Sequence, residues 1–150
     1  MIAENILLGI LAKLGLYKPL DHPYRVFNLE SKKCESPLEI AFWNVGYFEL
    51  SQFGDFAPQI PFGPYRLDFA LTNIPEAPTL KIAIEIDGYD YHKSKEQRNN
   101  DTRRDRYLMR NGWQVIRFTG SQIHENTADC VQEAVGLVKE YISWLGYFGS

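Results

Sequence analysis

Two acidic side chains near the end of one predicted strand could do metal chemistry. Residues 81–92 read KIAIEIDGYDYH, a run in which isoleucines alternate with other residues. Because side chains alternate along a strand, Glu85 and Asp87 leave the same face, opposite three isoleucines. Carboxylates beside an apolar core are costly unless something neutralises them. A divalent metal ion is a compact neutraliser, and His92 follows within the next loop.

A third carboxylate lies on the preceding predicted strand. Asp68 comes 17 positions before Glu85, and the two residues converge on one face with Asp87 if their strands pair. Carboxylate oxygens without a histidine cluster favour magnesium or manganese over zinc. Mg²⁺ needs only one or two carboxylates when a phosphate completes its shell. Such an ion lowers the pKa of water and stabilises charge that develops on a phosphate.

A basic segment follows these carboxylates. Residues 93–117 hold eight basic and three acidic side chains, so this segment carries +5 and the rest −8 in a chain of net charge −3. A local basic face on an acidic protein fits the docking of a polyanion, with the helix holding a phosphate backbone. A solvated helix with internal ion pairs explains the same charges equally well. The candidate contacts are Lys93, Lys95, Arg98, Arg103 and Arg104.

Length and composition predict one globular domain: the chain has 150 residues, of which 45% are apolar and 14% aromatic. Its two cysteines, Cys34 and Cys130, are far apart, which argues against structural zinc and a disulfide framework. This usage predicts a cytoplasmic protein. Residues 1–16 read as an amphipathic helix rather than a membrane span. Residues 17–35 are expected to form a loop, and residues 36–146 the core.

The elements that must position these groups are readable from caps and periodicity. Ser36, Pro37 and Glu39 predict a helix start, and that helix is expected to end near Gly46. In the second predicted strand Leu67, Phe69 and Leu71 are expected to share a face. A long final helix is expected to begin at Asn126 or Thr127. The connection between the third and fourth predicted strands is long enough for a parallel βαβ unit. The other expected elements are strands at 56–60, 65–71, 79–87 and 113–118 and a helix at 95–111.

Three segments together resemble a known nuclease group. YRLDFAL, IAIEIDGYDYH and DTRRDRYLMRNGWQVIRF are similar to the small PD-(D/E)xK nucleases close to very-short-patch-repair endonucleases, in a branch with an E-x-D-G-x-x-x-H motif. The resemblance runs from about Ser36 to Val138. It implies an α/β fold with a restriction-endonuclease-like αβββαβ core, in which helices flank a mixed central sheet, here with an extra N-terminal helix.

The resemblance implies Mg²⁺-dependent hydrolysis of DNA phosphodiesters, with Mn²⁺ as a substitute. Asp68, Glu85 and the carbonyl of Ile86 would be metal ligands, and Glu39 would point into the site from the first helix. Asp87 stands where the group carries lysine. It would bind a second metal or act as a base, while Lys93, Lys95 or His92 supplies the missing positive charge.

Two other functions stay open at this point. Aspartate in place of the lysine fits a catalytically inactive nucleic-acid-binding or assembly module, and the same site fits a metal-dependent RNase. The expected partner is DNA, with no membrane. A homodimer and a larger assembly of nuclease and helicase type are both compatible with the sequence.

Overall fold

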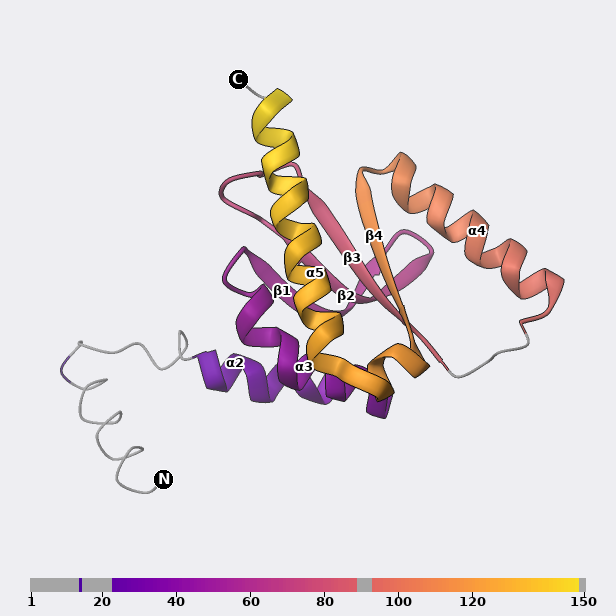
Figure 1. Ribbon diagram of the computed structural model, residues 1–150, viewed down its shortest axis with the longest axis horizontal. Helices are drawn as coiled ribbons and strands as arrows, with labels where there is room; N and C mark the ends of the chain where they lie inside the picture. The colour runs from indigo at the N-terminus through magenta and orange to yellow at the C-terminus, as the bar shows by residue number, and fades with distance from the viewer. Residues whose placement is uncertain (1–13, 15–22, 89–92, 149–150) are drawn as a thin grey trace.

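A computed structural model describes residue 14, residues 23–88 and residues 93–148 of the 150-residue chain. Its centre is a mixed four-stranded sheet in the order β1-β2-β3-β4 (Figure 1). The first three strands pair antiparallel, whereas β3 and β4 pair parallel across a helical crossover. The strands are β1 (Asp55–Phe62), β2 (Tyr65–Thr72), β3 (Lys81–Asp87) and β4 (Trp113–Thr119). The expected α/β class with a mixed central sheet is confirmed.

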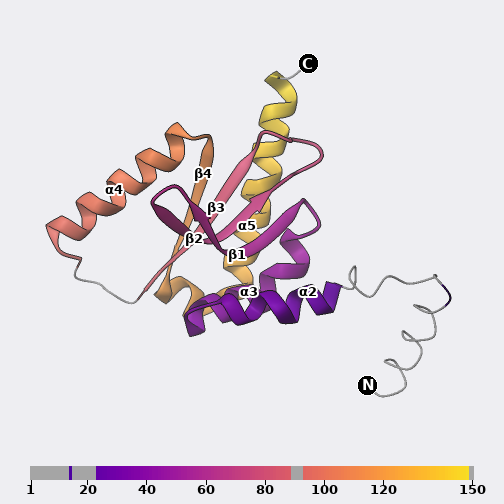
Figure 2. The same cartoon turned by 180° about the vertical axis from the view of Figure 1, so that it is seen from behind.

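Helices cover both faces of this sheet, as Figures 1 and 2 show from opposite sides. Ile82 and Ile84 belong to the main core with helices α3 (Pro37–Leu50) and α5 (Gly120–Phe148). Ala83, between them, belongs to a smaller cluster with Leu108 of helix α4 (Lys95–Arg110). The predicted alternation of β3 is therefore correct, and Glu85 continues the face of Ala83 toward α4.

Helix α3 begins as its sequence predicts. Ser36 is the N-cap, and its hydroxyl accepts a hydrogen bond from the Glu39 N–H at 3.1 Å. The expected end near Gly46 is wrong, since the helix continues to Leu50. Gly46 is a packing residue instead: a Cβ there would lie 3.4 Å from Val131 of α5. That distance is an ordinary van der Waals contact, so Gly46 lies within the packing of α3 against α5 and does not end α3.

The expected loop at 17–35 contains a short helix, which corrects that prediction. Helix α2 spans Pro23–Glu30, and a 3₁₀ turn, η2, spans Ser31–Lys33. Phe27 of α2 stacks on Trp43 of α3, and the Trp43 indole donates a hydrogen bond to the Phe27 carbonyl at 3.2 Å. Tertiary aromatic contacts thus hold an element whose local signals are weak. The predicted N-terminal helix at 1–16 lies outside the described residues, apart from residue 14.

Two further details differ from expectation. Leu67 packs in the cluster beneath α4, whereas Phe69 and Leu71 pack in the main core, so the three do not share a face. Helix α5 starts at Gly120, before its expected cap, but it has a non-helical residue at Asn126. The side-chain oxygen of Asn126 accepts from the Asp129 N–H at 3.1 Å, as a cap does. Among the described residues, no helix has the length and apolar character needed to cross a membrane.

Candidate active site

Strand pairing brings Asp68 and Glu85 together. The β2–β3 register ends at the pair of Phe69 with Ile84, and just beyond it the side chains of Asp68 and Glu85 are hydrogen-bonded to each other. Asp68 Oδ2 accepts a hydrogen bond from the Ile86 N–H at 2.8 Å. This bond fixes the Asp68 side chain against β3. The two carboxylates that the sequence selected therefore come from neighbouring strands and meet on the side of the sheet that α4 covers.

Burial makes this pair costly to ionise. Glu85 is 1% exposed, and burial followed by the charge of Asp68 raises its pKa to about 8. Burial likewise raises the pKa of Asp68, while the hydrogen bond from the Ile86 N–H opposes that rise. The pair is therefore poised to bind a proton or a metal cation.

One guanidinium offsets part of the negative charge. Arg104 of α4 donates from Nη2 to Glu85 Oε2 at 2.7 Å and to the Arg66 carbonyl at 2.8 Å. Glu85 Oε1 is buried, and no amide, hydroxyl or cationic group of the described residues donates to it; the Glu85 and Asp68 side chains are instead hydrogen-bonded to each other, which adds to the effect of burial in raising the pKa of Glu85. Glu85 thus has one oxygen bonded to an arginine, while its remaining partner is a second carboxyl group, an arrangement that needs either a shared proton or a cation.

This arrangement fits a magnesium ion with few protein ligands. Within residues 23–88 and 93–148, no group of three or more His, Cys, Asp or Glu side chains is placed to hold a metal. Two carboxylates are nevertheless enough for Mg²⁺, which retains waters and takes further oxygens from a bound phosphate. The contact between two carboxyl groups, which a cation can hold together once the shared proton leaves, is the observation that favours a cation here. The structure gives no contact of the Ile86 carbonyl, so its role stays a prediction.

Asp87 follows Glu85 on the same face, but its carboxylate is engaged by cations. Its Oδ1 accepts from Arg117 Nη1 at 2.9 Å and lies 3.6 Å from Lys93 Nζ. Arg117 also bonds Asp105 at 2.6 Å, and Lys93 bonds Asp101 at 2.8 Å. The expected convergence of three acids is therefore limited to two. Asp87 belongs to an ion network that ties α4 to the ends of β3 and β4.

Glu39 lies at the start of α3, next to the pair. It is 7% exposed, and its carboxylate accepts from the Glu35 N–H, the Ser36 hydroxyl and the Gln59 amide at 2.8, 3.2 and 2.8 Å. Its charge contributes to the raised pKa of Asp68, after burial. The capping box expected with Ser36 is therefore replaced by a bond from the Glu35 N–H, and the site role of Glu39 stays a prediction. Its oxygens already have donors, unlike Glu85 Oε1.

The comparison with known families shows which class of protein carries this site. Residues 49–136 match the REase_MTES_1575 family, a restriction-endonuclease-like family, and this match covers the whole sheet, all of α4 and the first part of α5. The chain belongs to the REase_MTES_1575 family. Such a family indicates a nuclease of the hydrolase class and supports the superfamily that the sequence motifs resemble. No solved structure matches the chain.

Two curated relatives of this REase_MTES_1575 chain are themselves uncharacterised. An uncharacterised protein of Haemophilus influenzae is 34% identical over 95 residues, covering 63% of this chain and 54% of the relative. The uncharacterised protein YcjD of Escherichia coli is 32% identical over 91 residues, covering 59% of this chain and 66% of that relative. The chain thus spans between about half and two thirds of the curated relatives it matches.

The expected nucleic-acid contacts separate into two groups on the structure. Arg104 points inward to Glu85, and Lys93 is paired with Asp101. Arg98 is exposed and donates to the Lys93 carbonyl at 2.8 Å. Lys95 and Arg103 are exposed on α4 and have no carboxylate partner among the described residues. His92 lies outside the described residues. The basic helix therefore divides its charges between the site and solvent.

Two contributors were not assigned these roles from the sequence. The inward direction of Arg104, which pairs with Glu85, could have been predicted: Arg104 is four positions before the buried Leu108, so both lie on the same helix face. Gln59 had none: it is a polar residue within a predicted strand, and only the structure places it against Glu39.

Proposed function

We propose that this chain is a Mg²⁺-dependent endonuclease that hydrolyses DNA phosphodiester bonds. The observation that carries this proposal is the contact between the half-buried Asp68 and the buried Glu85 in a chain of a restriction-endonuclease-like family. A catalytic metal with a phosphate as its further ligand would offset the cost of placing two carboxylates together.

Asp68 and Glu85 would hold the ion, with the Ile86 carbonyl as a third oxygen donor. When bound, the ion would polarise the scissile phosphate and promote attack by water. The Ile86 N–H orients Asp68 at 2.8 Å, and Arg104 orients Glu85 at 2.7 Å. Both ligands are thus held by hydrogen bonds before any substrate arrives, which lowers the reorganisation needed for catalysis.

Positive charge near the reacting phosphate would come from residues other than position 87. Lys93 Nζ lies 3.6 Å from Asp87 Oδ1. Lys93, which follows β3 in the chain, therefore places a positive charge next to residue 87, where the nuclease group carries its lysine. We keep Asp87 as a base or second-metal ligand in this proposal. Either task requires its carboxylate to exchange the bond from Arg117. His92 remains a candidate for the same charge-stabilising task.

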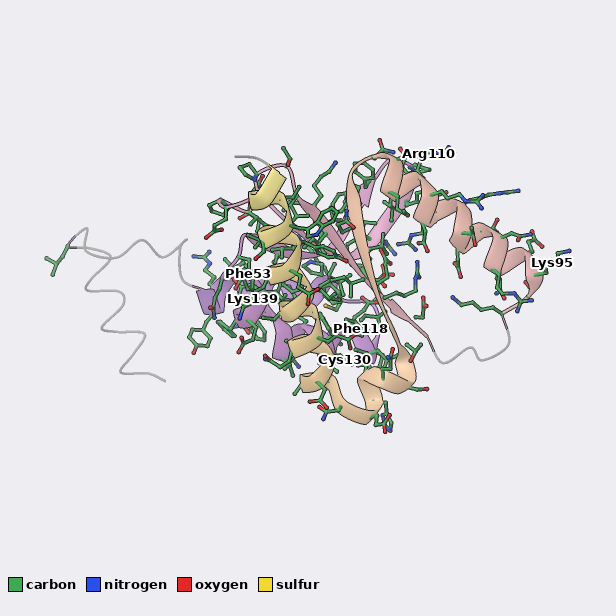
Figure 3. All side chains as sticks on the ribbon, turned by 45° about the horizontal axis from the view of Figure 1, so that its top comes forward. Phe53, Lys95, Arg110, Phe118, Cys130 and Lys139 are labelled. Carbon is green, nitrogen blue, oxygen red and sulfur yellow. The ribbon has the colours of Figure 1, made fainter. Side chains whose placement is uncertain are left out.

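The DNA backbone would lie along the basic residues of α4. Lys95 and Arg103 are exposed and without carboxylate partners in the described chain, and Arg98 is exposed beside them. Figure 3 shows α4 between Lys95 and Arg110, on the other side of the molecule from Lys139. Phosphate contacts of this kind position a duplex without reading its sequence.

Nicking of a supercoiled plasmid tests the proposal. The wild-type chain should convert the plasmid to open circles with Mg²⁺ or Mn²⁺ and leave it intact with chelator. Glu85→Gln and Asp68→Asn keep side-chain size but remove a charge, and both should abolish nicking. Glu140→Gln, an exposed acid on α5, is the matched control and should nick normally.

Further arms of the same experiment separate the rival functions. Preferential cleavage of RNA over duplex DNA would replace the proposal with a metal-dependent RNase. Equal DNA binding with and without chelator, together with intact plasmid under several metals, would replace it with a non-catalytic binding module. Calorimetric titration with Mn²⁺ adds an activity-independent measurement, and binding should be lost in Asp68→Asn.

A further inference from the structure

A strained glutamine lies inside strand β1. Gln59 has a φ of 54°, and among the described non-glycine residues only Asn73 also has a positive φ. L-residues rarely adopt this conformation, and asparagine tolerates it better than glutamine. Such strain persists where the surrounding structure demands it, and it gathers at functional sites. Glycine would adopt the same backbone freely, so the glutamine side chain needs a reason.

The position of Gln59 supplies that reason. The β1–β2 register pairs Pro58 with Phe69 and Ile60 with Leu67, so Gln59 lies opposite Asp68. Its side-chain amide donates to Glu39 Oε2 at 2.8 Å. Gln59 therefore connects the first turn of α3 to the sheet directly beside the carboxylate pair, which itself lies on the next two strands.

We propose that Gln59 is a positioning residue of the carboxylate site, whose amide holds the Glu39 carboxylate beside Asp68. The role rests on the proposed function, because it matters only if the acidic pair binds a cation. Glu39 adds negative charge next to the pair, which increases the attraction for a divalent cation. The positive φ of Gln59 thus coincides with the strand residue whose amide donates to Glu39.

Two substitutions separate this role from a purely structural one. Gln59→Gly and Gln59→Ala both remove the amide, but only glycine relieves the positive φ. Gln59→Gly should therefore unfold at a higher temperature than Gln59→Ala. Both should bind Mn²⁺ about 10- to 100-fold more weakly than wild type, as expected for loss of an outer-shell hydrogen bond. Calorimetry measures the affinity without any need for cleavage.

Asn73→Gly is the matched control. Asn73 has a φ of 52° just after β2, and its amide donates to the exposed Asp55. Relief of strain there should leave Mn²⁺ affinity and nicking at wild-type levels. Wild-type Mn²⁺ affinity in Gln59→Gly would overturn the inference, because the glutamine would then be only a turn residue.

A double-mutant cycle tests whether Gln59 acts through Glu39. In Glu39→Gln the added Gln59→Gly change should have little further effect on Mn²⁺ affinity, whereas independent roles would give additive losses. Additive losses would overturn the inference. Failure of the proposed function looks different: wild-type chain that binds Mn²⁺ without nicking DNA loses the endonuclease proposal but leaves the Gln59 cycle measurable. Wild-type chain that binds no Mn²⁺ ends both.

Discussion

The carboxyl group of Glu85 lies where its charge is expensive. Burial and Asp68 raise its pKa from 4.5 to about 8, against the opposing effects of Arg104 and Arg117. The folded chain therefore binds a proton at Glu85 in a pH range where the unfolded chain has released it. Folding and proton binding are linked, and so are proton release and the binding of a cation.

This linkage fixes the sign of one pH dependence. Between about pH 4.5 and pH 8, the native state holds a proton that the unfolded state has lost, so the free energy of unfolding should fall as pH rises. Thermal unfolding of metal-free protein across this range measures it. Glu85→Gln removes the titrating group and should flatten the profile, with the largest gain over wild type near pH 8. A parallel decline in Glu85→Gln would assign the effect to other groups.

Arg104 should contribute to stability as well as to the site. Arg104→Gln leaves Glu85 Oε2 without its charged donor at 2.7 Å, and the expected loss is about 1–3 kcal/mol of unfolding free energy in denaturant. Arg106→Gln, on the exposed side of α4, should change the free energy by less than about 0.5 kcal/mol. Equal losses of unfolding free energy in the two variants would mean that the contact with Glu85 does not contribute to stability.

At the scale of elements, glycines mark where backbones approach. A Cβ at Gly54 would lie 2.5 Å from the Thr72 carbonyl oxygen and 3.2 Å from that of Asn73. Backbone atoms cannot move aside as a flexible side chain does, so Gly54→Ala should lower the free energy of unfolding by about 1–3 kcal/mol.

A Cβ at Gly136 in α5 would meet no described atom within 4 Å. Gly136→Ala should thus stabilise the helix by about 0.5–1 kcal/mol. Denaturant unfolding of both variants checks the opposite signs.

The elements show what a sequence can and cannot predict. Alternation in β3 predicted that Glu85 faces away from the isoleucine core, and Ser36 predicted the start of α3, because both signals are local. Helix α2 was missed because Phe27 and Trp43, from different elements, hold it. The ion pair of Asp87 with Arg117 needs the parallel β3–β4 register, which joins residues 30 positions apart. Long-range contacts of this kind have no local signature.

At the scale of the whole molecule, charge is divided between faces. The chain carries −3 overall, yet the exposed residues of α4 include cations without a described carboxylate partner, such as Lys95 and Arg103. The inward cations of the same region are engaged by Glu85, Asp87 and Asp101. In a chain of net negative charge these exposed cations should attract DNA to α4, which would orient a duplex before any contact with the acidic pair.

This asymmetry predicts how DNA binding responds to salt. With chelator present, the logarithm of the wild-type binding constant should fall linearly with the logarithm of salt concentration. Lys95→Gln with Arg103→Gln should weaken binding for all sequences alike and reduce the slope by about 2, one for each lost phosphate contact. Fluorescence anisotropy of a labelled duplex measures both quantities.

Lys139→Gln provides the matched loss of positive charge on α5, on the side of the molecule away from α4 in Figure 3. It should change net charge by the same step as each α4 substitution while leaving the slope unchanged, because a phosphate contact requires proximity. If Lys139→Gln reduces the slope as much as Arg103→Gln does, DNA responds to net charge alone. The duplex would then have no preferred face, and access to the Asp68–Glu85 pair would depend on the site itself.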